Sequence, residues 1–158
     1  MGVELTGEEV FAMAEQIEQE AAAFYFRAAS ACRNTRSRRT LLSLAEMEAD
    51  HEQVFSAMKT KFLDSTHAAP SNDRLRWPQL VQLFASGAEE ALSAEFTGDE
   101  SGDDILRKAI LFEKETIVFF LGIKNMLEDP KAKNQVEGIL KEEIGHVLQL
   151  TSRLATGT

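Results

Sequence analysis

The sequence has 158 residues, 44% of them hydrophobic, which is enough to bury the core of one domain without cross-links. Its formal net charge of -9 argues against binding to nucleic acid, because phosphate recognition needs a clustered basic surface. The single cysteine, Cys32, excludes an intramolecular disulfide and a Cys-x-x-Cys redox or metal motif.

Helix-forming residues dominate the composition. Only 3 Pro and 9 Gly interrupt a sequence rich in Ala, Glu, Leu and Lys. The N-terminal residues do not resemble a secretion signal, and no apolar run reaches the roughly 18 residues of a membrane span. We therefore expect an all-α protein of the cytoplasm, in one domain over residues 1–158.

Apolar residues three or four positions apart predict four long helices. These are expected at about residues 8–33, 37–63, 103–128 and 131–154. Asn34 and Thr35 separate the first helix from the second, Asp103 is the expected cap of the third, and Asp129 with Pro130 separates the third from the fourth. Because these breaks are short, the helices should form two hairpins.

A segment of about residues 64–102 joins the hairpins. It contains Pro70 and Pro78, and a short helix is expected from about Gln79 to Phe96. A simple up-down-up-down bundle needs only a few residues at this point. The length of the segment therefore predicts a crossover that travels the length of the bundle.

The second hairpin repeats the first at an offset of 95 residues. The offset places Glu20 over Glu115, Glu48 over Glu143, and His51 over His146. In each copy a Glu-x-x-His element begins 28 residues after the first glutamate. The match falls on residues that are unusual in a helix core, so the two hairpins are expected to be pseudo-symmetric.

Every predicted helix interrupts its apolar stripe with a carboxylate. Steps of three or four residues lead from Ile17 to Glu20 in the first helix, and from Phe112 to Glu115 in the third. Residues 34 and 129, midway between the paired glutamates, fall at the predicted turns, so the four glutamates should lie at one level. Glu18 and Glu113 should lie on the wrong face and be solvated.

Four buried carboxylates would repel one another and must be neutralised. Two divalent cations supply this charge, while two neutral imidazoles donate nitrogen lone pairs. One Glu from each of two helices and Glu-x-x-His from each of the other two form the ligand set of di-iron and di-manganese bundles. The predicted ligands are Glu20, Glu48, His51, Glu115, Glu143 and His146. The absence of thiolate ligands suits iron or manganese, and zinc would tolerate the set.

Three stretches resemble helices of the rubrerythrin and bacterioferritin branch of the ferritin-like superfamily. They read Glu-Ala-Ala-Ala-Phe-Tyr from Glu20, Leu-Ala-Glu-Met-Glu-Ala-Asp-His from Leu44, and Phe-Glu-Lys-Glu-Thr-Ile-Val-Phe-Phe from Phe112. The resemblance implies a ferritin-like four-helix bundle that binds two iron ions.

The resemblance also implies roles for the predicted site residues. Glu20 and Glu115 would be terminal ligands, Glu48 and Glu143 would bridge, and His51 and His146 would each complete one metal. Tyr25 matches the family's tyrosine near the metals, where it either hydrogen-bonds a ligating carboxylate or only packs.

Two departures from the rubrerythrin pattern narrow the resemblance. One cysteine cannot hold a rubredoxin domain, so an electron donor would be external, such as a separate rubredoxin. Classical rubrerythrins carry a further carboxylate three residues after the third-helix ligand, where this sequence has Val118. The six-ligand set is thus closer to the bacterioferritin type.

The expected activity is redox chemistry with hydrogen peroxide or dioxygen, either as a peroxide reductase with an external donor or as a ferroxidase, with Glu48, Glu143 and Tyr25 as the catalytic residues. Iron storage and a non-catalytic metal-binding bundle are the alternatives. We expect a homodimer, with no nucleic acid or membrane partner.

Overall fold

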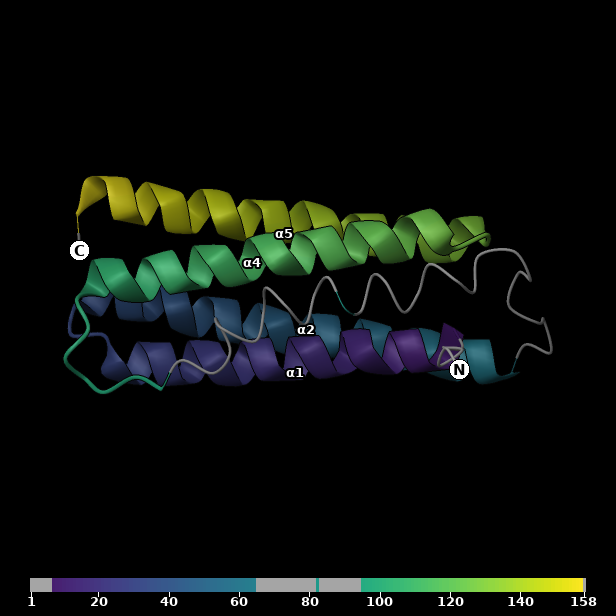
Figure 1. Ribbon diagram of the computed structural model, residues 1–158, viewed down its shortest axis with the longest axis horizontal. Helices are drawn as coiled ribbons and strands as arrows, with labels where there is room; N and C mark the ends of the chain where they lie inside the picture. The colour runs from purple at the N-terminus through teal and green to yellow at the C-terminus, as the bar shows by residue number, and fades with distance from the viewer. Residues whose placement is uncertain (1–6, 65–81, 83–94, 158) are drawn as a thin grey trace.

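Figure 1 shows the computed structural model of the chain, which describes residues 7–64, 82 and 95–157. Its long helices are α1 (Gly7–Ala31), α2 (Thr35–Asp64), α4 (Gly102–Met126) and α5 (Pro130–Thr156). No strand occurs in these residues, and each end of a long helix lies within two residues of the predicted one. The short helix predicted in the crossover falls almost entirely outside the described residues.

The four helices form a bundle of two antiparallel hairpins. α1 pairs with α2 and α4 pairs with α5, while α4 also contacts α1 and α5 contacts α2. α2 ends at the right-hand end of Figure 1 and α4 begins at the left-hand end. The connection between the hairpins therefore joins opposite ends of the bundle, as its length predicted.

Side-chain caps define the start of the second hairpin. Ser101, rather than the predicted Asp103, is the N-cap of α4: its hydroxyl accepts a hydrogen bond from the backbone N–H of Asp104 at 3.1 Å, in a reciprocal capping box. Asp129 is the N-cap of α5: its side chain accepts a hydrogen bond from the N–H of Ala132 at 3.0 Å, and Pro130 occupies the first turn. The break predicted at Asp129 and Pro130 is confirmed.

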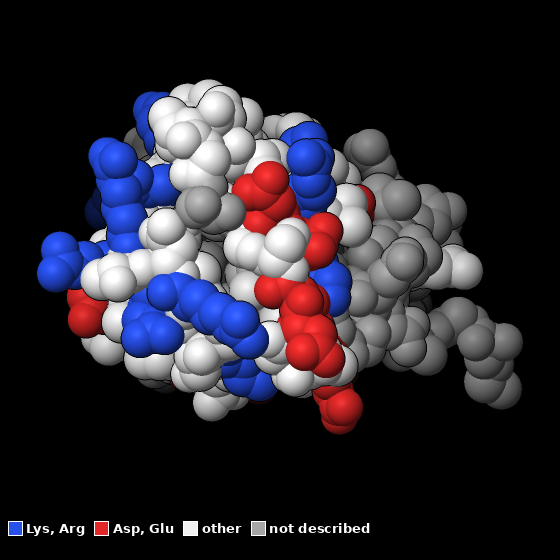
Figure 2. All heavy atoms as spheres, turned by 90° about the vertical axis from the view of Figure 1, so that its left-hand side faces the viewer, with Lys and Arg blue, Asp and Glu red and all other residues white. Residues whose placement is uncertain are grey.

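Arginines cover the end of the bundle where α1 turns into α2. Figure 2 looks onto this end and shows most of its Lys and Arg side chains toward the left, with most Asp and Glu side chains to the right of the centre. Arg38 donates hydrogen bonds to the carbonyls of Ala29 at 3.2 Å and Cys32 at 2.8 Å. It thus satisfies carbonyl groups that the end of α1 leaves without helical partners.

Two apolar clusters fill the bundle, one toward each end. One includes Phe11, Phe55 and Ile123, and the other includes Leu41 and Leu150. Between them the helices bring buried acidic and histidine side chains to one level. Apolar packing on both sides separates this level from water at the ends of the bundle. None of the described helices combines the length and apolar character needed to cross a bilayer.

Candidate metal centre

Six acidic and histidine side chains meet in the middle of the bundle, and none is more than 4% exposed. They are Glu18 of α1, Glu48 and His51 of α2, Glu113 of α4, and Glu143 and His146 of α5. Each helix contributes at least one carboxylate, so the site depends on the assembly of all four helices.

The six residues form two overlapping groups of possible ligands. The first group is Glu18, Glu48, His51 and Glu143. The second group is Glu48, Glu113, Glu143 and His146. Within each group, one nitrogen or oxygen atom per residue lies within 4.8 Å of the others. Glu48 and Glu143 belong to both groups, while each group has its own glutamate and histidine.

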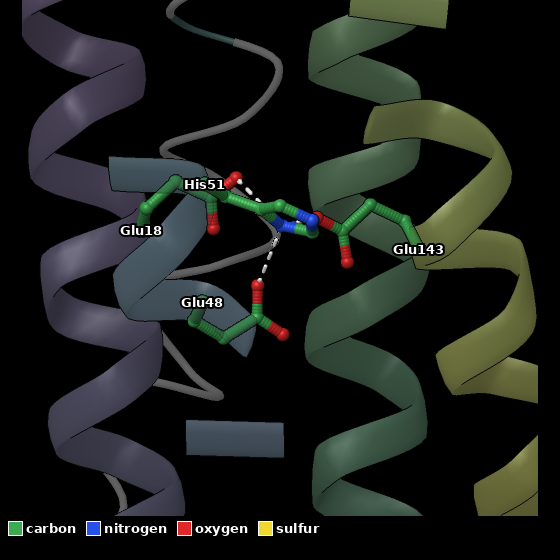
Figure 3. A group of neighbouring side chains, drawn as sticks. All are labelled: Glu18, Glu48, His51 and Glu143. Carbon is green, nitrogen blue, oxygen red and sulfur yellow. Dashed lines mark hydrogen bonds and ion pairs between the residues drawn. The ribbon is translucent and has the colours of Figure 1, made fainter. Parts of the chain in front are cut away.

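His51 lies at the centre of the first group. Its Nδ1 atom is 2.9 Å from Oε1 of Glu143, 3.1 Å from Oε2 of Glu48 and 3.7 Å from Oε1 of Glu18. Figure 3 shows these three carboxylates, from three helices, pointing toward the imidazole. The same ring nitrogen of His51 therefore faces the three carboxylates of its group.

His146 repeats this geometry in the second group. Its Nδ1 atom is 2.9 Å from Oε2 of Glu143, 3.0 Å from Oε1 of Glu48 and 3.5 Å from Oε1 of Glu113. The two imidazoles stack, with centroids 5.8 Å apart and an interplanar angle of 20°. Each shared glutamate thus has an oxygen near each histidine.

The structure corrects the predicted helix faces of α1 and α4. Glu20 is half-buried and accepts a hydrogen bond from Gln16 at 2.9 Å, and Glu115 is also half-buried. Neither belongs to the two groups, whereas Glu18 and Glu113, predicted to be solvated, are 0% and 1% exposed. The other four predicted ligands lie where the sequence placed them.

Helical geometry explains this correction. Successive residues advance by about 100° around a helix, so Glu20 lies about 100° from the buried Ala21, while Glu18 lies about 60° from it. Glu115 and Glu113 stand in the same relation to the buried Thr116. The true stripes therefore pass through Ala21 and Thr116, small or polar residues that carry a weak apolar signal.

The internal repeat could not separate the two pairs, because an offset of 95 residues matches Glu18 with Glu113 as well as Glu20 with Glu115. The turns do separate them. Residue 33, midway between Glu18 and Glu48, is the centre of the loop between α1 and α2, and residue 128 has the same relation to Glu113 and Glu143. The predicted breaks were one residue too late, which favoured the wrong glutamates.

Tyr25 and Glu142 contact the cluster from outside. The fully buried Tyr25 donates a hydrogen bond from its hydroxyl to Oε1 of Glu113. Oε2 of Glu142 is 2.9 Å from Nε2 of His51, and its side chain is 56% exposed. Neither contact repeats on the other side of the cluster, since the offset of 95 residues matches Tyr25 with Phe120 and Glu142 with Met47.

Burial and neighbouring charge shift the pKa values of the carboxyl groups in opposite directions. Burial, reinforced by the charges of Glu143 and Glu48, raises the pKa of Glu18 well above 4.5. Burial and the charge of Glu143 also raise the pKa of Glu113, despite its contact with His146. For Glu143, contacts with His146 and His51 outweigh burial and lower the pKa to about 2.

Both histidines bind protons tightly in the absence of metal. Burial alone would lower their pKa values, but the facing carboxylates outweigh it. Glu143 and Glu48 raise the pKa of His51 to about 10. Glu113, Glu143 and Glu48 raise that of His146 to about 12. The shifts favour protons on the histidines, Glu18 and Glu113, which reduce the charge repulsion in the metal-free cluster.

The residues also fit a pair of metal ions. In the described part of the chain, no aligned hydrogen-bond partner is found for six buried atoms, namely both carboxylate oxygens of Glu18 and of Glu143 and both ring nitrogens of His146. Polar atoms that converge without pairing are arranged for a shared cation rather than for one another. Four carboxylates and two imidazoles without a thiolate suit iron or manganese, and zinc would tolerate them.

Comparisons with known proteins agree with this architecture. A family model described as a ferritin-like domain matches residues 8–155. The chain is also similar in structure to a protein from Thermotoga maritima described as a ferritin-like diiron-carboxylate protein. The two are 22% identical, with a TM-score of 0.70 over 100% of both chains. No curated protein matches the chain. The predicted all-α four-helix bundle is confirmed.

Proposed function

The chain belongs to the ferritin-like family, and we propose that it is a di-iron carboxylate oxidoreductase that reduces hydrogen peroxide or dioxygen. The observation that carries the proposal is the pair of overlapping ligand groups that share Glu48 and Glu143. The description of the Thermotoga maritima protein as diiron-carboxylate supports the choice of metal. We propose that the chain belongs to the rubrerythrin and bacterioferritin branch, because three of its helical stretches resemble the helices of that branch.

The overlap of the groups supports a role for each ligand. Glu48 and Glu143 would bridge two ions, because each offers one oxygen to either histidine. Glu18 with His51 would complete one ion, and Glu113 with His146 would complete the other, because each of these pairs belongs to one group only. Two divalent cations would balance four carboxylates, so bound metal would replace the protons of the metal-free cluster.

Two ferrous ions, when bound, would supply two electrons to the oxidant, one from each iron. Hydrogen peroxide takes up two electrons and two protons and gives two water molecules, so a reductase must also manage protons. The hydroxyl of Tyr25 donates a hydrogen bond to Glu113. Burial, and after it the charge of Glu113, raises the pKa of Tyr25 well above 10. In this proposal Tyr25 orients Glu113 and stays protonated.

Reduction of peroxide over many turnovers needs electrons from outside the chain. An external donor such as a rubredoxin would make the protein a rubrerythrin-like peroxide reductase. Without a donor the same site would be a ferroxidase. The proposed set still has six ligands when Glu113 replaces Glu115. Classical rubrerythrins carry a further carboxylate three residues after this ligand, but here that residue is Thr116. Its hydroxyl donates to the carbonyl of Phe112 at 3.1 Å.

A non-catalytic metal-binding or iron-storage role is the second candidate. The observation that favours it is the burial of all six ligands, none more than 4% exposed, between apolar clusters that restrict access by an oxidant. In this case the ions would mainly neutralise the core and stabilise the bundle.

Anaerobic loading with two equivalents of ferrous iron, followed by peroxide or air, separates the two candidates. We expect ferric absorption in the near ultraviolet together with consumption of the oxidant, and loss of both in Glu143→Gln. Glu20→Gln is the matched control, because Glu20 is a half-buried glutamate outside both groups. Iron that binds without being oxidised would favour the second candidate. Full activity in Glu143→Gln would contradict the assigned site.

A further inference from the structure

We infer that the two metal positions are inequivalent, and that the first group (Glu18, Glu48, His51 and Glu143) binds its ion before and more tightly than the second (Glu48, Glu113, Glu143 and His146). The inference rests on the proposed di-metal site. It assigns to Glu142, which is not a member of either group, the role of a positioning residue for His51. Two differences between the groups lead to it.

The first difference lies in the outer nitrogen of each imidazole. Nδ1 of His51 faces the cluster, and Nε2 lies 2.9 Å from Oε2 of Glu142. When Nδ1 binds a metal, the ring proton is on Nε2 and is donated to Glu142. A carboxylate in this place fixes the tautomer and orientation of a histidine ligand and makes it more basic. His51 is therefore prepared to bind metal.

Among the described residues, His146 lacks such a partner. Its Nδ1 faces the cluster in the same way, but its Nε2 is buried and has no hydrogen-bond partner in this part of the chain. The residue that corresponds to Glu142 across the repeat is Met47, whose thioether accepts hydrogen bonds only weakly. The repeat therefore does not provide His146 with a counterpart of the carboxylate that accepts from His51.

The second difference lies in the glutamate of each group. Tyr25 donates a hydrogen bond to Oε1 of Glu113, whereas the residue that corresponds to it across the repeat is Phe120, which has no hydroxyl. A donated hydrogen bond occupies a lone pair and reduces the strength of Glu113 as a metal ligand. Within residues 7–64, 82 and 95–157, both carboxylate oxygens of Glu18 are without a hydrogen-bond partner and remain available. Both differences favour the first group.

Titration of the metal-free protein with cobalt(II), under argon, tests the inference through the visible absorption of bound cobalt and through heat of binding. We expect two binding steps of different affinity. Glu142→Gln should weaken the tighter step by about 10–100-fold and leave the weaker step unchanged. Glu142→Asp, which keeps the carboxylate, should retain the tighter step. Met47→Glu should tighten the weaker step by supplying His146 with a partner.

Glu46→Gln is the matched control for charge, because it removes one exposed carboxylate from α2 without touching either histidine. It should leave both steps as they are. Thermal unfolding of each metal-free variant checks the fold, which Glu142→Gln should preserve because the side chain is 56% exposed.

Three results would overturn the inference while the di-metal site stands: two cobalt ions bound with equal affinity, equal weakening of both steps by Glu142→Gln, or no effect of Glu142→Gln on either step. A wild-type protein that binds fewer than two cobalt ions would instead overturn the proposed function.

Discussion

The α1–α2 hairpin and the α4–α5 hairpin carry the same ligand types at the same heights, but they differ in what surrounds those ligands. Glu18, Glu48 and His51 match Glu113, Glu143 and His146 at an offset of 95 residues. The two residues that contact the cluster from outside, Tyr25 and Glu142, correspond at this offset to Phe120 and Met47, which are of other types. The ligands set what the bundle can bind, and the unmatched residues set how the two positions differ.

A change in a shared ligand should have the largest effect, because it touches both hairpins at once. In Glu143→Gln each group loses a carboxylate oxygen that lies 2.9 Å from its histidine. We expect the bound metal to fall from two ions per chain to none, measured by elemental analysis after dialysis against dilute zinc. A variant that keeps both ions would show that Glu143 does not bridge.

A change in an unshared ligand should affect one position only. Glu18→Gln and Glu113→Gln should each reduce the bound metal from two ions to one, because each residue belongs to a single group. Glu20→Gln and Glu115→Gln are the matched controls in the same helices and should keep two ions. If the two controls lost metal while Glu18→Gln and Glu113→Gln kept both ions, the ligands would be Glu20 and Glu115, as predicted from the sequence.

Those four variants also test how far the sequence determines the site. Periodicity, capping residues and the repeat predicted the four long helices, and they placed Glu48, His51, Glu143 and His146 in the interior. Steps of three or four residues cannot choose between two adjacent stripes of one helix. The sequence pattern favoured the stripe through Ile17 and Glu20. It did not favour the buried stripe through Ala14, Glu18 and Ala21, because alanine contributes little apolar signal.

The contact between His51 and Glu142 could not be predicted from the sequence. Glu142 is largely exposed and lies in a different hairpin, 91 residues away along the chain, so no local pattern connects it to His51. The pairing depends on the relative height and rotation of α2 and α5. These follow from the packing of the whole bundle, not from the periodicity of either helix.

Stability should depend on pH in opposite ways without and with metal. Folding raises the pKa values of four groups: Glu18, Glu113, His51 and His146. Such a group stabilises the folded state fully when the pH is below its pKa in the unfolded chain. This stabilisation is lost as the pH rises toward its pKa in the folded protein. Glu143, with a lowered pKa of about 2, contributes constantly above pH 5 or so. The metal-free protein should therefore lose stability from about pH 5 to pH 8.

Metal competes with the same protons, so the stabilisation by added zinc should grow over that pH range. Thermal unfolding at several pH values, with and without zinc, measures both trends. Glu18→Gln cannot titrate and should flatten the slope of the metal-free protein, whereas Glu20→Gln should keep it. A metal-free protein that becomes more stable as pH rises would contradict the protonated state assigned to the cluster.

The smallest change concerns Tyr25, where the two hairpins differ by one hydroxyl group. Tyr25→Phe makes the position match Phe120 and removes the hydrogen bond to Glu113. Because both partners are buried, we expect a loss of about 1–3 kcal/mol in the metal-free protein, measured by urea unfolding. The freed lone pair of Glu113 should strengthen the second group, so part of this loss should be recovered when metal is bound.

Thr116→Val is the matched control for Tyr25→Phe. It removes another buried hydroxyl group, which donates to the backbone carbonyl of Phe112 in its own helix. Its cost should be the same with and without metal, because this hydroxyl donates to the helix backbone and not to a proposed ligand. An equal response of the two variants to metal would mean that Tyr25 only fills space, and that the two hairpins differ at Glu142 alone.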